Sequence, residues 1–112
     1  RAVASEYEYQ AHKRNVTQRL HTAWSALQQH AARVNTYQQK IIPLLKRAMD
    51  EVGQGYAQGR YRYQDWHIAR EELIEAERQL ISSASAALIS RTLIEELTAR
   101  AVSNQTTQDT PQ

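Results

Sequence analysis

The placement of the glycines constrains this 112-residue chain more than any other feature. All three, Gly53, Gly55 and Gly59, fall within seven residues near the midpoint. Glycine lets a backbone reverse its direction, whereas a stretch without glycine lets a helix continue. Each long glycine-free flank carries apolar residues at heptad spacing. The pattern predicts an all-α fold, in which one long antiparallel helical hairpin forms a coiled coil.

The predicted hairpin is one domain that covers residues 1–102. Arm one is expected at about 2–52, the turn at about 53–64 and arm two at about 65–101. Residues 103–112 are mostly polar, with Pro111 near the end, and we expect them to form a polar tail.

Arm one carries an apolar seam that we predict from alternating steps of four and three residues. Its members are Leu20, Trp24, Leu27, Ala31, Val34, Gln38, Ile41, Leu45, Ala48 and Val52. A second stripe with a spacing of seven runs beside it and comprises Val16, Ala23, His30, Tyr37 and Leu44. Pro43 lies inside this arm, where a proline costs about 3 kcal/mol. Because the heptad pattern continues beyond it, we predict a kinked but continuous helix, with a break at Ile42–Pro43 as the alternative.

Arm two has a stricter pattern and a wider apolar face. Its predicted seam is Trp66, Ala69, Leu73, Ala76, Leu80, Ser83, Ala87, Ser90, Ile94 and Leu97. A neighbouring stripe contains Ile74, Ile81 and Leu88. We interpret Trp24 and Trp66 as packing anchors on the two seams. Two helices need only one narrow seam, so the second stripe predicts self-association, as a dimer or four-helix bundle for the hairpin alone.

Composition argues against several classes of function. The chain has no cysteine and a net charge of only +2, with basic and acidic residues interspersed, which argues against a nucleic-acid partner. No apolar run approaches the roughly 20 residues of a membrane-spanning helix. The spacing of nine residues between His12, His21 and His30 does not suit a helical metal site, which needs ligands one turn apart. No catalytic constellation is present, so we predict no enzymatic activity, no metal site and no cofactor.

The turn and its flanks resemble a known family. Ile41-Ile42-Pro43 precedes the turn by about a dozen residues, Tyr56-x-x-Gly59 forms its centre, and Asp65-Trp66 begins the second arm. Further along come Ala69, Glu75-Ala76 and Leu97-Thr98-Ala99. In this combination the chain resembles the second periplasmic helical hairpin of the TolC-like outer-membrane efflux proteins, most of all those of heavy-metal (cobalt-zinc-cadmium or copper-silver) pumps. It departs from the family in Gln58, where an aliphatic residue is usual, in Ala99, where glycine closes the motif, and in lacking the β-strands.

The resemblance implies a fragment of an α-barrel tunnel, closed by three subunits in the periplasm below an outer-membrane barrel. The turn would then be the periplasmic tip, where a periplasmic adaptor protein docks and links the channel to an inner-membrane pump. By position, the adaptor contact would involve Tyr56, Gln58, Gly59 and Arg60. Asp65 would be a gate carboxylate, with Arg62 as its salt-bridge partner, although a carboxylate in the first turn also stabilises its own helix.

A different class of function fits the same pattern. A coiled-coil hairpin that is not part of a channel, such as the hairpin of an adaptor or a scaffold, would also carry long heptad arms and a glycine turn. We keep this interaction module as the alternative function.

Overall fold

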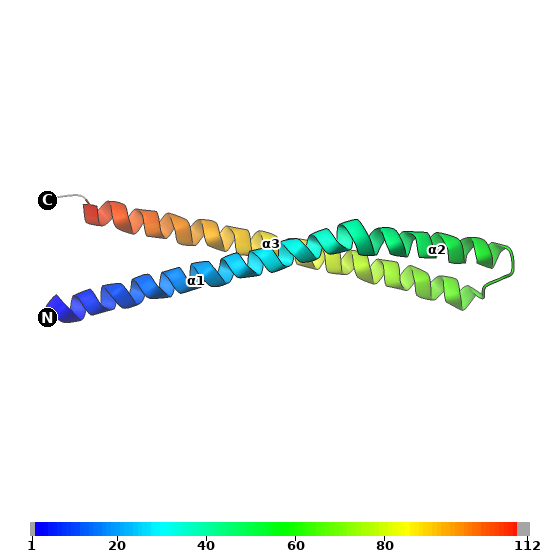
Figure 1. Ribbon diagram of the computed structural model, residues 1–112, viewed down its shortest axis with the longest axis horizontal. Helices are drawn as coiled ribbons and strands as arrows, with labels where there is room; N and C mark the ends of the chain where they lie inside the picture. The colour runs from blue at the N-terminus through cyan, green and yellow to red at the C-terminus, as the bar shows by residue number, and fades with distance from the viewer. Residues whose placement is uncertain (1, 110–112) are drawn as a thin grey trace. The chain divides into compact units, whose positions relative to one another are not determined.

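The computed structural model describes residues 2–109, and side chains for residues 3–103, and it confirms the all-α helical hairpin (Figure 1). Arm one consists of α1 (Ala2–Thr36), the π-helical turn η1 (Tyr37–Ile41) and α2 (Ile42–Ala57). The returning arm is α3 (Tyr63–Asp109). Within the described range, residues 58–62 alone are not helical. Within residues 2–109, no helix has both the length and the apolar content that crossing a membrane requires.

The described residues fall into two compact units. The first contains 2–28 and 87–109, and the second contains Gln29–Ala86, including the turn. In the first unit the buried side chains include Ala23 and Leu97. In the second unit Ile42, Leu73 and Ala76 form a buried cluster. The partly buried side chains of Tyr37, Ile41, Leu45, Met49 and Leu80 pack against this cluster.

The predicted seam of arm two is confirmed along its whole length. Every one of its ten positions from Trp66 to Leu97 is buried or half-buried. Leu73, Ala76, Ser83 and Leu97 are the most deeply buried of them. Alternating steps of three and four keep these side chains on one face, because 3.5 residues per repeat nearly match the helical turn.

The predicted seam of arm one is only partly right. Leu20, Leu27 and Val34 are half-buried as expected, but Trp24 is 52% exposed, so it is not a buried packing anchor. Ala31 and Gln38 are exposed as well. The inward positions between them come from the second stripe, namely Val16, Ala23, His30 and Tyr37. The buried face of arm one therefore takes positions from both predicted stripes. Polar Gln38 and bulky Trp24 remain in solvent, and the small side chain of Ala23 allows α1 to pack closely against α3.

The π-helical turn η1 explains how arm one passes Pro43. Helical conformation is continuous from Ala2 to Ala57, as predicted, and the N–H of Ile42 donates to the carbonyl of Tyr37, five residues earlier. In a regular α-helix the proline ring clashes with the carbonyl four residues back, and a wider turn displaces that carbonyl.

The same turn adds inward positions beside the predicted seam of arm one. The predicted members Ile41, Leu45, Ala48 and Val52 are all half-buried, while Ile42 is buried and Met49 is half-buried beside them. The step from Tyr37 to Ile42 is five residues where a heptad seam takes four. The π-helical turn holds the one extra residue, so the seam continues on the same face.

Two predicted boundaries need correction. The turn is shorter than 53–64, because Gly53 and Gly55 belong to α2 and only Gly59 lies at the reversal. Residues 103–109 of the predicted tail are helical, since α3 extends to Asp109. No glycine or proline interrupts the chain from Tyr63 until Pro111, so nothing in the sequence ends the helix earlier. Residues 110–112 of that predicted tail lie outside the described residues.

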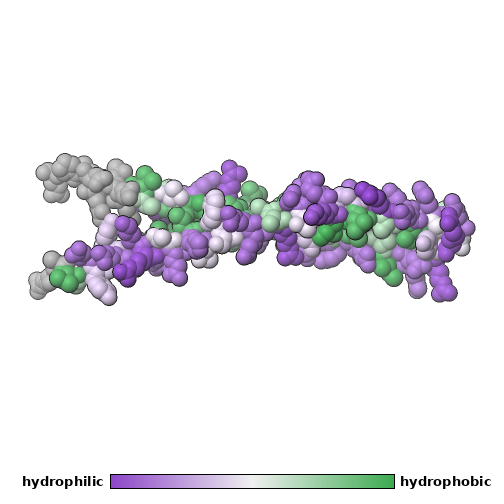
Figure 2. All heavy atoms as spheres, viewed as in Figure 1, coloured by the Kyte–Doolittle hydropathy of each residue, from purple (hydrophilic) through white to green (hydrophobic). Residues whose placement is uncertain are grey.

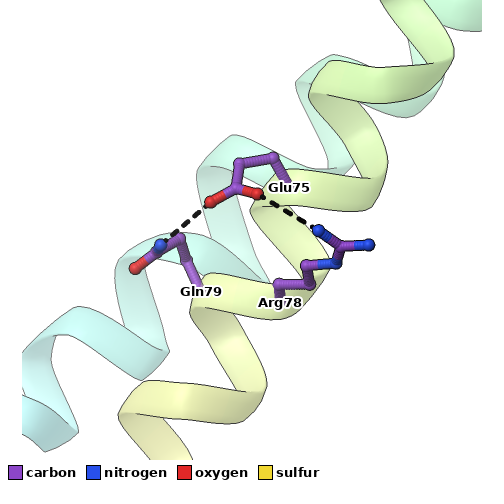
Figure 3. A network of polar contacts seen from close by, with 3 residues as sticks. All are labelled: Glu75, Arg78 and Gln79. Carbon is purple, nitrogen blue, oxygen red and sulfur yellow. Dashed lines mark hydrogen bonds and ion pairs between the residues drawn. The ribbon is translucent and has the colours of Figure 1, made fainter.

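A polar clip links the two arms in the second unit. The Nη2 of Arg33 donates to Oε1 of Gln79 at 3.1 Å, and Nε2 of Gln79 donates to Oε1 of Glu75 at 3.1 Å. Glu75 also lies 3.9 Å from Nη1 of Arg78 (Figure 3). Because these side chains are largely exposed, the clip contributes little free energy, but it sets Arg33 opposite Gln79.

Large apolar side chains remain on the surface after the seam has formed. On α3, Ile81 is 66% and Leu88 is 63% exposed, as expected for the second stripe of arm two, whereas Ile74, its third member, is half-buried. On arm one, Trp24 and Leu44 are exposed too. Hydrophobic side chains are correspondingly visible on the surface and are not enclosed (Figure 2). The hairpin thus uses one apolar face and leaves a second one open.

Candidate docking site at the turn

The end of α2 has the hydrogen bonds of a Schellman motif. The N–H of Arg60 donates to the carbonyl of Gly55 at 2.7 Å, and the N–H of Gly59 donates to the carbonyl of Tyr56 at 3.0 Å. Gly59 has φ of 79°, the left-handed conformation that this motif requires and that glycine adopts without steric cost. The turn therefore has a defined shape that its own backbone maintains.

The other two glycines permit aromatic rings to approach the backbone of α2. A Cβ at Gly55 would overlap the ring of Tyr61, and a Cβ at Gly53 would lie 3.3 Å from Nε1 of Trp66. At Gly59, by contrast, a Cβ would meet no atom within 4 Å. Gly55 and Gly53 thus serve packing, whereas Gly59 serves the chain reversal and faces open space.

The start of α3 is stabilised by Asp65. Its Oδ2 accepts a hydrogen bond of 3.0 Å from the backbone N–H of Arg62, the residue just before the helix. This is one half of a capping box, in which the third helical residue reaches back to the cap. Among side chains 3–103 the ion pairs are Arg78–Glu75 and Arg91–Glu95, so the expected salt bridge between Asp65 and the Arg62 guanidinium is not formed.

Gln58 and Arg60 interact across the apex of the turn. The Nε of Arg60 donates to Oε1 of Gln58 at 3.1 Å, and Nη2 of Arg60 donates to the same oxygen. Both residues are exposed, as are Tyr56 and Gly59. All four residues predicted for docking therefore lie together on the accessible surface at the turn.

An aromatic cluster of Tyr56, Tyr63, Trp66 and His67 occupies the side of this turn. Tyr56 contacts Tyr63 edge-on at 6.0 Å and lies parallel to Trp66 at 6.4 Å between ring centroids. Tyr63 also contacts Trp66 at 5.8 Å and stacks on His67 at 6.2 Å. Tyr56 and Tyr63 remain 45% and 55% exposed. The contacts hold the rings in place while their outer faces stay open.

Sequence reasoning assigned Tyr56 to the site but missed Tyr63 and His67, and treated Trp66 only as a packing residue. A signal was present: of six tyrosines and two tryptophans in the chain, four lie between residues 56 and 66. Such a density of aromatic residues in an otherwise aromatic-poor chain is typical of a contact surface.

Within the described residues, no three His, Asp or Glu side chains gather in a way that would hold a metal ion. The turn presents a shaped backbone, exposed rings and arginines, which are groups that bind another surface. Comparisons with protein-family models, with curated proteins and with solved structures found no match to this chain.

Proposed function

We propose that the chain is a periplasmic tunnel hairpin of a trimeric outer-membrane efflux channel, and that its turn docks a periplasmic adaptor. The channel would belong to a tripartite export pump, of the heavy-metal type, with an inner-membrane pump at its other end. The chain would act as a passive part of the wall of the conduit and would carry out no reaction.

The observation that carries this proposal is the open apolar face of α3. Ile81 and Leu88 are exposed although the hairpin has already formed its own seam. A helix in a closed ring needs a neighbour on each side, which requires two apolar faces. The exposed face fits that requirement, whereas an isolated hairpin would leave it in water, where large apolar patches favour association.

The turn supports the docking half of the proposal. A docking tip must keep its shape before its partner arrives, because ordering a loop on binding lowers affinity. The Schellman bonds of Arg60 and Gly59 and the capping contact of Asp65 give the turn such a shape. A gate role for Asp65 and Arg62 stays a prediction, since the capping contact alone accounts for the position of the carboxylate.

Gly59→Asn in the full-length protein tests the docking tip. Asparagine tolerates the left-handed conformation, and its side chain would extend into the open space beside Gly59. We expect adaptor binding to weaken at least tenfold and export to fall, with helicity unchanged by circular dichroism. Ser82→Asn is the control, because Ser82 is exposed on α3, away from the turn, and lies about 100° around the helix from Ile81 on the open face.

Export at the wild-type level by Gly59→Asn would contradict the tip assignment. Binding at the turn by a protein that forms no ring would instead favour the interaction-module alternative, a hairpin of an adaptor or scaffold.

A further inference from the structure

We propose that the aromatic cluster, and not the apex at Gln58–Arg60, supplies most of the binding energy of docking. The partner surface would be an α-helix that presents aliphatic side chains flanked by carboxylates. This inference rests on the proposed function, because it specifies the chemistry of the partner at the same turn.

The cluster continues along one strip of α3. Tyr63, His67 and Arg70 follow one another at steps of four and three residues, which places them on one side of the helix. The strip ends before half-buried Ile74, where the stripe that continues to Ile81 and Leu88 begins. Tyr56 extends the strip from α2 through its contacts with Tyr63 and Trp66. A strip about one helix wide and about two turns long fits a helical partner that lies along it.

The rings are suited to bind because their positions are already fixed. Each ring in the cluster contacts at least one other ring, so binding costs little side-chain entropy. Tyrosine, tryptophan and arginine dominate binding hot spots, where they fill pockets between aliphatic side chains. The apex offers less binding energy, because the guanidinium of Arg60 already donates to Gln58 and because Gly59 has no side chain.

The charge on the strip points to acidic groups in the partner. The guanidinium of Arg70 lies 5.8 Å from the ring centroid of Trp66, where it is oriented beside the cluster. Arg62 precedes Tyr63 directly and adds a second positive charge. The carboxylates of Asp65, which accepts from the backbone N–H of Arg62, and of exposed Glu71 offset part of this charge. Carboxylates beside the aliphatic residues of a partner would therefore pair with Arg70.

The experiment measures binding of the adaptor to the full-length channel protein by biolayer interferometry, with variants in the cluster and at matched distant positions. Tyr63→Ala removes the ring at the centre of the cluster, and Tyr7→Ala removes an exposed tyrosine ring from the first unit. Arg70→Glu reverses the charge on the strip, and Arg91→Glu does so at an exposed position of α3 in the first unit. Circular dichroism confirms that each variant remains helical.

We expect Tyr63→Ala and Arg70→Glu each to raise Kd at least tenfold, while Tyr7→Ala and Arg91→Glu change it less than twofold. Raising the salt concentration should weaken the wild type more than Arg70→Glu, because salt screens the charge pairs.

If the wild type binds and Tyr63→Ala binds equally well, the inference is wrong and the proposed function stands. If only Arg70→Glu is without effect, the acidic character of the partner is refuted. If the wild type itself does not bind the adaptor, the proposed function fails and the inference fails with it.

Discussion

Deleting Gln39 should remove the single residue that takes arm one out of heptad register. Gln39 is exposed and lies in the π-helical turn, between Tyr37 and Ile42 on the seam. After the deletion, the steps from Tyr37 through Ile42, Leu45 and onward become four, three, four and three. A regular α-helix then places the same side chains on the same face.

The deletion must be made in a Pro43→Ala background. In a regular helix Pro43 would lose the relief that the π-helical turn provides, at a cost of about 3 kcal/mol. With alanine at 43, we expect the further deletion of Gln39 to change the free energy of unfolding by no more than about 1 kcal/mol, which is the size of a typical point mutation.

Deletion of Ser82 in the same background is the matched control. Ser82 is also exposed, but it lies in α3, which has no extra residue to release. The deletion rotates one side of α3 by about 100° and removes Leu73 and Leu80 from the cluster they form with Ile42. At about 1.5–3 kcal/mol for each large side chain, the loss should reach about 3–6 kcal/mol.

Urea unfolding followed by circular dichroism measures these differences, at one fixed chain concentration because association adds to apparent stability. If the Gln39 deletion destabilises the Pro43→Ala protein as much as the Ser82 deletion does, the π-helical turn does not compensate an extra residue and the register argument is refuted.

Three further predictions concern the turn and are read by thermal or urea unfolding. Gly59→Ala should lower stability by about 1–2 kcal/mol, because φ of 79° is left-handed, and Gly59→Asn should lower it by less; equal effects would contradict a left-handed role. Asp65→Ala should lose about 1 kcal/mol with the hydrogen bond to the N–H of Arg62, and an unchanged stability would show that this cap is not needed. Gly55→Ala should destabilise the wild type but stabilise a Tyr61→Ala protein by up to about 1 kcal/mol, since only the ring of Tyr61 opposes the better helix former; additive effects would exclude that contact.

The sequence was enough to predict the hairpin and all of the arm-two seam, because α3 keeps one uninterrupted heptad pattern. It was not enough for arm one, where two apolar stripes overlap and either one fits the local spacing. Whether Ala23 or Trp24 faces inward depends on how closely α1 approaches its partner, and a heptad count contains no distance. The one-residue excess before Pro43 was hidden for the same reason, since Ile41 and Ile42 are equally apolar.

At the turn, sequence spacing located the chain reversal but did not show that the three glycines have different structural roles. Gly59 allows the chain to reverse, whereas Gly55 leaves room for the ring of Tyr61 against its backbone. Tyr61 reaches Gly55 only once the turn has formed, so the spacing alone does not show this contact. The cap formed by Asp65 follows a local rule and was predictable. The contact of Tyr63 with Tyr56 joins two helices, so it emerges only when both arms are placed. The stacking of Tyr63 on His67 is a pair four residues apart within α3, which the spacing alone allows.

Site-specific photo-crosslinking in cells tests the central claim most directly. Benzoylphenylalanine would be placed in the full-length protein at Arg60 on the turn and, separately, at Ile81 on the open face of α3. The account predicts that position 81 crosslinks to another copy of the same protein and position 60 to a periplasmic adaptor of different sequence. Crosslinks from position 60 to a second copy, or none from position 81, would contradict a hairpin that lines a ring and docks by its turn.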